Sequence, residues 1–138
     1  MKDNGNKKIN NLTEMSQRVT QEAATEPPFS GELLKEDRDG MYHCIVCDHE
    51  LFSSETKFDS GSGWPSFYEA VTDKNIQLKP DGYLGMKRTE VQCGNCGAHL
   101  GHVFNDGPKE SPDGTPASGK RFCVNSCSLE FSPNESVD

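Results

Sequence analysis

Two Cys-x-x-Cys motifs are the strongest constraint that this sequence places on its fold. Each motif puts two sulfur atoms on one tight turn, and together they supply four thiolates, the tetrahedral ligand set that structural zinc prefers. Residues 48–92 separate the motifs, which is longer than the spacing of a simple zinc ribbon. We therefore expect each motif to lie in the turn of its own β-hairpin. The four candidate ligands are Cys44, Cys47, Cys93 and Cys96.

Four cysteines fill the coordination sphere of zinc and leave no position for a substrate. The predicted ion is therefore structural, with one Zn²⁺ per chain. The competing interpretation is two thioredoxin-like redox pairs. Such pairs are typical of a βαβ pattern, and neither motif lies in one.

Composition fits one domain with a modest core, since the chain has 138 residues and 32% of them are hydrophobic. A bound metal is a common further source of stability for such a domain. The formal net charge of −8 disfavours nucleic acid or an anionic membrane as the main partner, because both require a basic surface. The charge also opposes a nucleic-acid-binding zinc ribbon.

The sequence predicts a cytoplasmic protein. No apolar stretch is long enough to span a bilayer, and residues 1–11 are polar, without the apolar core of a signal peptide. In a reducing cytosol, six cysteines are more typical of metal binding or catalysis than of a disulfide framework.

Local signals predict several elements. Residues 1–11 are expected to form a solvated tail. A short helix is expected over Leu12–Ala24, capped by Thr13 and ended by Pro27-Pro28. Residues Val71–Tyr83 indicate a strand, a polar turn around Pro80-Asp81-Gly82 and a second strand. Residues 107–120 form a long loop, which in a compact domain is usually functional or mobile.

Cys123 is the candidate nucleophile. It lies in an alternating run, Phe122, Val124, Ser126, Ser128, that predicts a β-strand, so Cys123 and Asn125 should share one face of it. Arg121 and Lys120 precede the cysteine, and a neighbouring cation favours the reactive thiolate form of a thiol. The alternative is that Cys123 is a small buried hydrophobic residue.

Trp64 is the only tryptophan, and the sequence places it in a bent loop. Gly61 and Gly63 permit an unusual backbone path, and Pro65 fixes the dihedral angle after the tryptophan. Loops often carry function, and an aromatic face suits a methyl group or a cation. The alternative is that Trp64 anchors the core.

Two histidines follow the second Cys-x-x-Cys motif. His99 and His102 are three residues apart, and Asp106 follows four residues later. Because four cysteines already satisfy the zinc, these histidines are available for proton transfer or hydrogen bonding. The alternative is a structural role for both.

These motifs occur in an order that resembles a known family. The residues concerned are Gly61-x-Gly63-Trp64-Pro65-Ser66-Phe67, His99-x-x-His102-Val103-Phe104 with Asp106, and Arg121-Phe122-Cys123-x-Asn125-Ser126. With the two Cys-x-x-Cys turns they resemble the methionine-R-sulfoxide reductases of the B type. Residues 18–22 and 25–31 match as well, so the resemblance covers residues 12–132 and leaves tails at 1–11 and 133–138.

The resemblance implies a mainly β fold: two antiparallel sheets with short N-terminal helices and a zinc site remote from the chemistry. It implies a peptide-methionine (R)-S-oxide reductase that acts on free or protein-bound methionine-R-sulfoxide. We expect the protein to be a monomer. Each epimer of methionine sulfoxide has its own enzyme, and the R epimer is implied by the family alone.

The resemblance also implies a role for each residue. Cys123 attacks the sulfoxide sulfur as a thiolate that Arg121 helps to maintain. His99 and His102 bind the oxygen and one delivers a proton. After methionine leaves, Cys123 is a sulfenic acid. The positioning residues are Asp106 and Asn125, and the expected methyl-binding residues are Trp64 and, more weakly, Phe122.

One position departs from a common family pattern. Many members carry a resolving cysteine directly before the Gly-Trp pair, and this chain has Ser62 there. The spare thiol is Cys127, which in an extended strand lies about 13 Å from Cys123, whereas a disulfide needs Cα atoms within about 7 Å. We therefore expect thioredoxin or a small thiol to reduce Cys123 directly.

A second functional hypothesis is a zinc-stabilised β domain that binds a protein partner through the Trp64 loop, since a fold does not fix a function. A pure binding module would not require Cys123, His99, His102 and Asp106 together.

Overall fold

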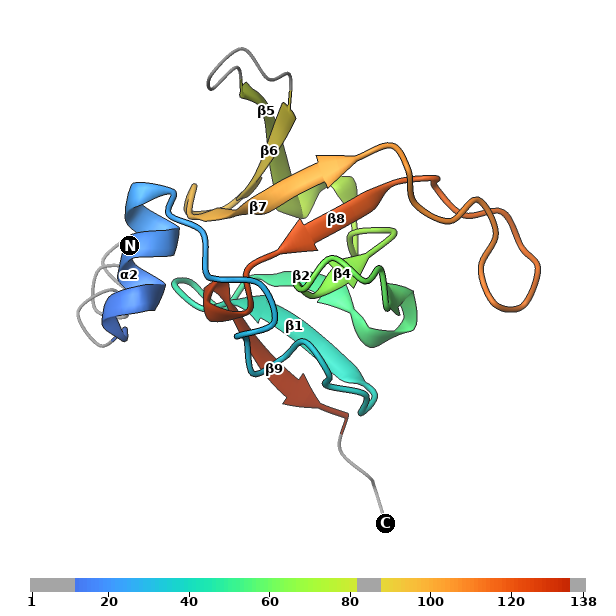
Figure 1. The fold of residues 1–138 in the computed structure, drawn as a ribbon, viewed down its shortest axis with the longest axis horizontal. Coiled ribbons are helices and arrows are strands. Elements are labelled where there is room, and N and C mark those ends of the chain that lie inside the picture. The colour runs from blue at the N-terminus through green and yellow to red at the C-terminus, as the bar shows by residue number, and fades with distance from the viewer. Residues whose placement is uncertain (1–11, 82–87, 135–138) are drawn as a thin grey trace.

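Two antiparallel sheets form the protein, as the sequence predicts. The computed structural model describes residues 12–81 and 88–134. The tail expected over 1–11 lies outside the described residues, as do Gly82, Tyr83 and residues 135–138. The described part contains one α-helix of the short helices expected near the N-terminus (Figure 1).

The smaller sheet has the strand order β2-β1-β9, and the larger sheet has the order β3-β4-β8-β7-β6-β5. The strands are β1 (Gly40–Cys44), β2 (Glu50–Ser53), β3 (Lys57–Phe58), β4 (Ser66–Phe67), β5 (Ile76–Asp81), β6 (Arg88–Cys93), β7 (His99–Phe104), β8 (Arg121–Val124) and β9 (Leu129–Pro133). The long loop between β7 and β8 extends away from the body of the fold (Figure 1).

Helix α2 (Glu14–Glu22) begins where its sequence predicts. The Thr13 side chain accepts a hydrogen bond from the backbone N–H of Ser16, which satisfies one of the free donors at a helix start. Val19 is fully buried, and the Ser16 hydroxyl donates to the carbonyl of Cys127. The helix therefore packs against the end of the chain. Within the described residues, no helix is long and apolar enough to cross a membrane.

An aromatic cluster joins the two sheets. Phe67 of β4 stacks on Phe52 of β2, with ring centroids 4.6 Å apart, and meets the edge of Tyr42 of β1 at 5.0 Å. Phe122 of β8, the cross-strand neighbour of Phe67, also contacts Phe52, with ring centroids 5.6 Å apart. These rings interlock residues from both sheets in arrangements that aromatic pairs prefer, so they form the centre of the core.

Two sequence predictions require correction. The strand expected from Val71 begins at Ile76, because the Thr72 side chain caps a 3₁₀ turn at Asp73–Asn75. Pro80 and Asp81, expected in a turn, belong to β5.

The strand that carries Cys123 is shorter than its alternation predicts. It ends at Val124, and Ser126–Ser128 form a 3₁₀ turn. The Ser128 hydroxyl donates to the carbonyl of Asn125 and supports this turn. The extended separation expected between Cys123 and Cys127 is therefore wrong, because the chain leaves the sheet between them.

We expect Phe67→Ala to lower the free energy of unfolding by about 3–5 kcal/mol, because it leaves a cavity where the two sheets meet. Urea denaturation followed by circular dichroism measures this change. Val71→Ala is the control: because the Val71 side chain is exposed, this substitution should change the free energy of unfolding by about 0.5 kcal/mol at most. Equal effects of the two substitutions would contradict the central role of this cluster.

Candidate functional site

Cys123 and Arg121 lie on the same face of β8, two residues apart. The Arg121 guanidinium donates from Nη1 to the Cys123 sulfur at 2.9 Å. Cys123 is itself buried, with 9% of its surface exposed. A cationic donor at this distance stabilises the thiolate over the thiol, so the geometry suits a nucleophilic cysteine.

Asp106 and Phe104 hold the arginine in this position. Both oxygens of Asp106 accept hydrogen bonds from Arg121, at 2.8 and 3.1 Å, and the guanidinium lies 4.5 Å from the centre of the Phe104 ring. The ion pair raises the pKa of Arg121 and lowers the pKa of Asp106. Asp106 binds two of the guanidinium nitrogens and the Phe104 ring lies beside the group, so the third nitrogen, Nη1, points at the Cys123 sulfur.

Serine hydroxyls surround the same sulfur atom. The oxygens of Ser62 and Ser66 lie 3.6 and 3.7 Å from the Cys123 sulfur. The Ser60 hydroxyl hydrogen-bonds with both, at 2.8 and 2.6 Å. The loop reaches the sulfur because Gly61 and Gly63 adopt positive φ angles of 75° and 94°, which glycine allows without strain.

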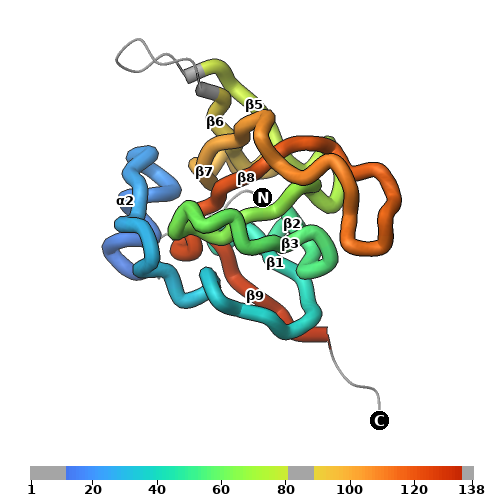
Figure 2. Tube along the Cα trace, turned by 45° about the vertical axis from the view of Figure 1, so that its right-hand side comes forward, coloured from blue at the N-terminus to red at the C-terminus, as the bar shows by residue number. Residues whose placement is uncertain are grey.

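Trp64 lies in this bent loop, as predicted, and is only half-buried. Its indole N–H donates to the backbone carbonyl of Glu26 at 2.9 Å, and this contact fixes the orientation of the ring. Figure 2 shows the N-terminal segment that carries Glu26 passing beside the loop. The alternative role as the main core anchor does not apply, because Trp64 is absent from the aromatic core.

Sequence reasoning assigned no role to Glu26, which is only 2% exposed. Its carboxylate accepts the backbone N–H groups of Ser126 and Cys127 at 2.9 and 3.0 Å. Its own N–H donates to the Asn125 side chain, whose amide group in turn donates to the carbonyl of Leu100. Glu26 and Asn125 therefore fix the chain directly after the Cys123 strand.

The two histidines come together through a β-bulge. Residues three apart in a regular strand point to opposite faces. Here the pairing of β6 with β7 shifts by one residue near Gln92, and the His99 and His102 rings meet edge to face at 5.6 Å. His102 is also the direct cross-strand neighbour of Cys123, which places the histidine pair beside the nucleophile.

His99 is oriented by a second acidic residue that the sequence did not reveal. Its Nδ1 lies 2.7 Å from a Glu90 carboxylate oxygen, while its Nε2 is buried and has no hydrogen-bond partner in the described part of the chain. Burial favours a higher pKa for Glu90, but hydrogen bonds from His99 and Gln92 outweigh it and lower the pKa.

Phe122, the weaker candidate for substrate contact, is not brought to this side. It is buried in the aromatic core, on the face of β8 opposite Cys123. Cys127, the spare thiol, is half-buried in the following turn. Burial, and then the Glu26 carboxylate, raise the pKa of Cys127 to about 12.

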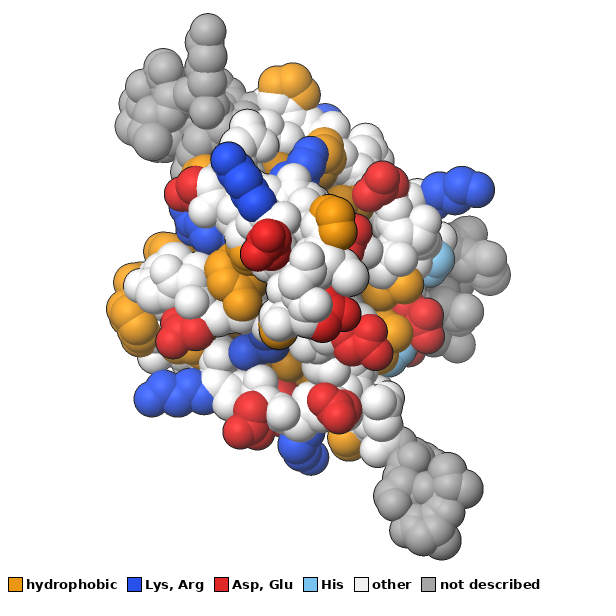
Figure 3. Space-filling view, turned by 90° about the vertical axis from the view of Figure 1, so that its right-hand side faces the viewer, with side chains coloured by type: hydrophobic (Ala, Val, Ile, Leu, Met, Phe, Trp, Pro, Cys, Tyr) orange, Lys and Arg blue, Asp and Glu red, His pale blue; other side chains and the backbone are white. Residues whose placement is uncertain are grey.

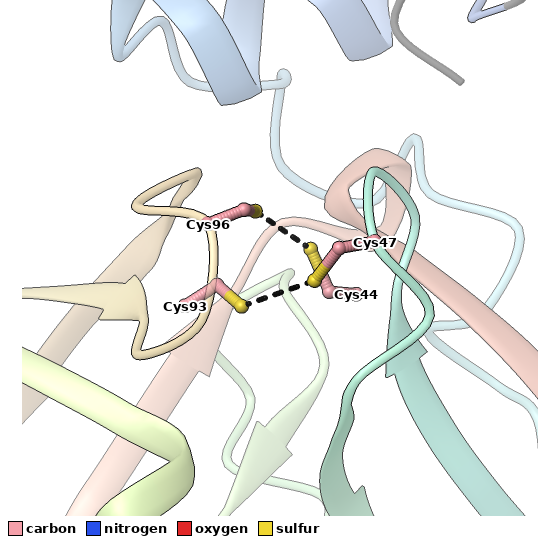
Figure 4. A group of neighbouring side chains, drawn as sticks. All are labelled: Cys44, Cys47, Cys93 and Cys96. Atoms are coloured by element: carbon pink, nitrogen blue, oxygen red, sulfur yellow. Dashed lines mark hydrogen bonds between the residues drawn. The ribbon is translucent and has the colours of Figure 1, made fainter. Parts of the chain in front are cut away.

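The four cysteines of the two motifs form one cluster, and it joins the two sheets (Figure 4). One pair lies in the β1–β2 turn and the other in the β6–β7 turn. Sulfur atoms face each other across the cluster at 3.6 Å, from Cys44 to Cys96 and from Cys47 to Cys93. Tetrahedral zinc with metal–sulfur bonds of about 2.3 Å would set sulfur atoms about 3.8 Å apart, so the cluster fits a metal ion of this kind.

Comparison with known proteins identifies the family. The SelR domain family matches residues 12–133. Peptide methionine sulfoxide reductase MsrB from Escherichia coli O139:H28 and from strain K12 are each 55% identical to the chain over 125 residues, which is 91% of this chain and 86% of the relative.

A solved structure supports the fold alone. The crystal structure of the Mis18 'Yippee-like' domain matches with a TM-score of 0.50 and 16% identity, over 72% of this chain and all of that domain. The sequence relatives carry the functional assignment: the chain belongs to the SelR domain family and is a peptide methionine sulfoxide reductase of the MsrB type.

Proposed function

We propose that the chain reduces the R epimer of methionine sulfoxide, free or in proteins, by attack of the Cys123 thiolate on the sulfoxide sulfur. The observation that carries this proposal is the Arg121 guanidinium, held by Asp106 and 2.9 Å from the Cys123 sulfur. A sulfoxide sulfur is electrophilic and a thiolate is the nucleophilic form of cysteine. The choice of the R epimer rests on the family.

The histidine pair would bind and protonate the sulfoxide oxygen. His99 gives one ring nitrogen to Glu90 and keeps the other, buried and unpaired, for the substrate. His102 neighbours Cys123 across the strands. In the overall step, the thiolate, the sulfoxide and one proton become a Cys123 sulfenic acid and methionine, so the oxygen passes from the substrate sulfur to the enzyme, the sulfoxide is reduced to the sulfide and the cysteine sulfur is oxidised.

Trp64 and Asn125 have different roles in this proposal. The fixed indole ring supplies an apolar face for the methyl group of the substrate. Asn125 acts as a positioning residue, because its amide oxygen and nitrogen are both bonded within the fold.

Thioredoxin or another thiol would then restore Cys123. Two external thiols convert the sulfenic acid to a thiol and water and leave as a disulfide. Cys127 is a poor internal substitute, since a pKa of about 12 keeps it protonated near neutral pH and only thiolates are good nucleophiles. The free state of all six cysteines agrees with a reducing compartment, and we propose a cytoplasmic monomer.

Excess methionine-R-sulfoxide, added to reduced protein without any reductant, should add one oxygen atom to Cys123. Intact-mass spectrometry with peptide mapping measures this, and Cys123→Ser is the control that should gain nothing. Loss of two hydrogens, mapped to Cys123 and Cys127, would contradict direct external reduction, as would loss of thioredoxin-driven turnover in Cys127→Ser with its first turnover intact. If neither the R nor the S epimer changed the mass of the protein, the reductase reaction would be contradicted.

Ser62→Cys should create an internal resolving thiol, because the Ser62 oxygen lies 3.6 Å from the Cys123 sulfur. After the same treatment, this variant should lose two hydrogens instead of gaining one oxygen. Adding Cys127→Ser to it should leave that result unchanged. Retention of the oxygen on Cys123 in Ser62→Cys would show that the loop cannot bring the two sulfur atoms to bonding distance.

We also propose that the four-cysteine cluster holds one structural zinc ion. Inductively coupled plasma mass spectrometry should find one zinc per chain. The Cys96→Ser variant should lose the zinc, and its melting temperature should be lower by roughly 10 °C or more. Cys127→Ser, outside the cluster, should keep the metal. Full stability of Cys96→Ser without metal would contradict a structural ion.

A further inference from the structure

Phe29 combines an exposed aromatic ring with an unfavourable backbone. Its side chain is 69% exposed and its φ angle is 65°, in the left-handed region that glycine and asparagine tolerate far better than a bulky residue. Its backbone N–H donates to the carbonyl of Gly63 at 2.7 Å. The fold would accept a smaller residue here more readily, so the ring points to a role outside packing.

The ring lies against the loop that carries Trp64. A Cβ atom added at Gly63 would lie 3.0 Å from two carbons of the Phe29 ring, so the ring covers Gly63 directly. Phe29 and Trp64 then line one pocket of about 430 Å³ together with Phe58, a size typical of ligand sites.

Charged residues also line this pocket. The Lys57 ammonium donates to the carbonyl of Leu34 at 2.8 Å, and Arg38 forms a two-point ion pair with Glu36. The face of the molecule drawn in Figure 3 likewise has hydrophobic side chains among acidic and basic ones. A pocket lined by both apolar and charged groups suits a polypeptide, whose side chains and amide groups alternate in character.

The pocket and the candidate active site share the loop that carries Trp64. Ser60 lines it and also hydrogen-bonds with Ser62 and Ser66, the two serines beside the Cys123 sulfur. Trp64, the proposed methyl-binding residue, is a wall of the pocket as well. A substrate that extends beyond its methionine sulfoxide side chain can therefore continue along the same loop.

We propose that this pocket binds the polypeptide chain next to the methionine sulfoxide residue, with an apolar side chain of the substrate packed on the Phe29 ring. This inference rests on the proposed function and specifies its substrate class. Phe29 is then a specificity residue for peptide substrates, and free methionine sulfoxide does not reach it.

Phe29→Gly is the sharpest test, since glycine removes the ring and accepts the positive φ angle. The substrates are a short peptide with leucine on both sides of one methionine-R-sulfoxide, and free methionine-R-sulfoxide. We expect kcat/KM for the peptide to fall about tenfold, mainly through KM, as for loss of one well-placed interface side chain. Turnover of the free amino acid should stay within about twofold of wild type.

Two further variants separate binding from folding. Phe29→Asn also suits the positive φ angle and should reproduce the loss. Leu78→Ala removes another exposed hydrophobic side chain, on β5, and should leave kcat/KM unchanged for both substrates. Thermal unfolding checks that every variant is folded.

Equal losses on both substrates would overturn the inference, because they would assign Phe29 to support of the Trp64 loop. An unchanged peptide KM would overturn it too. If wild-type protein reduced neither substrate, the proposed function itself would fail, which is a different outcome from either of these.

Discussion

A single buried carboxylate, that of Glu26, connects the parts of the candidate site. Burying an ionised group is unfavourable unless hydrogen bonds replace its water, and here the backbone N–H groups of Ser126 and Cys127 do so. The same residue holds Trp64 through its carbonyl and Asn125 through its N–H. Gly31 makes this approach possible, since a Cβ atom there would lie 2.6 Å from the carboxylate and 2.3 Å from Ser126.

The rest of the fold supplies a rigid frame for this arrangement. The aromatic cluster fills the space between the two sheets, and the four-cysteine cluster joins the turns at one end of them. Within the larger sheet, β7 and β8 set the reacting groups side by side, as His102 and Cys123 are direct neighbours. Residues on paired strands hold their separation better than residues on loops, which suits the roles that we propose for His102 and Cys123.

Local patterns in the sequence predicted much of this, and distant contacts explain what they missed. The Cys-x-x-Cys turns and the Thr13 cap depend on neighbouring residues, and both were found in the predicted places. The end of β8 at Val124 was missed because it depends on Glu26, about a hundred residues away, whose carboxylate accepts the backbone N–H of Ser126. His99 and His102, three residues apart, would point to opposite faces of a regular strand, and the bulge that brings them together could not be predicted from their spacing.

The separation between Glu26 and its partners has a consequence for synthesis. Chains are made from the N-terminus and domains usually fold as units, so Glu26 emerges 100 residues before Ser126. Strand β1 likewise cannot pair with β9, its partner on one side, until β9 has been synthesised. The Glu26 carboxylate can thus meet the backbone that follows Cys123 only after residues 126 and 127 have been made. A ribosome-bound fragment that ends before β8 would carry both Cys-x-x-Cys turns but would lack Arg121, Cys123 and the backbone that Glu26 binds.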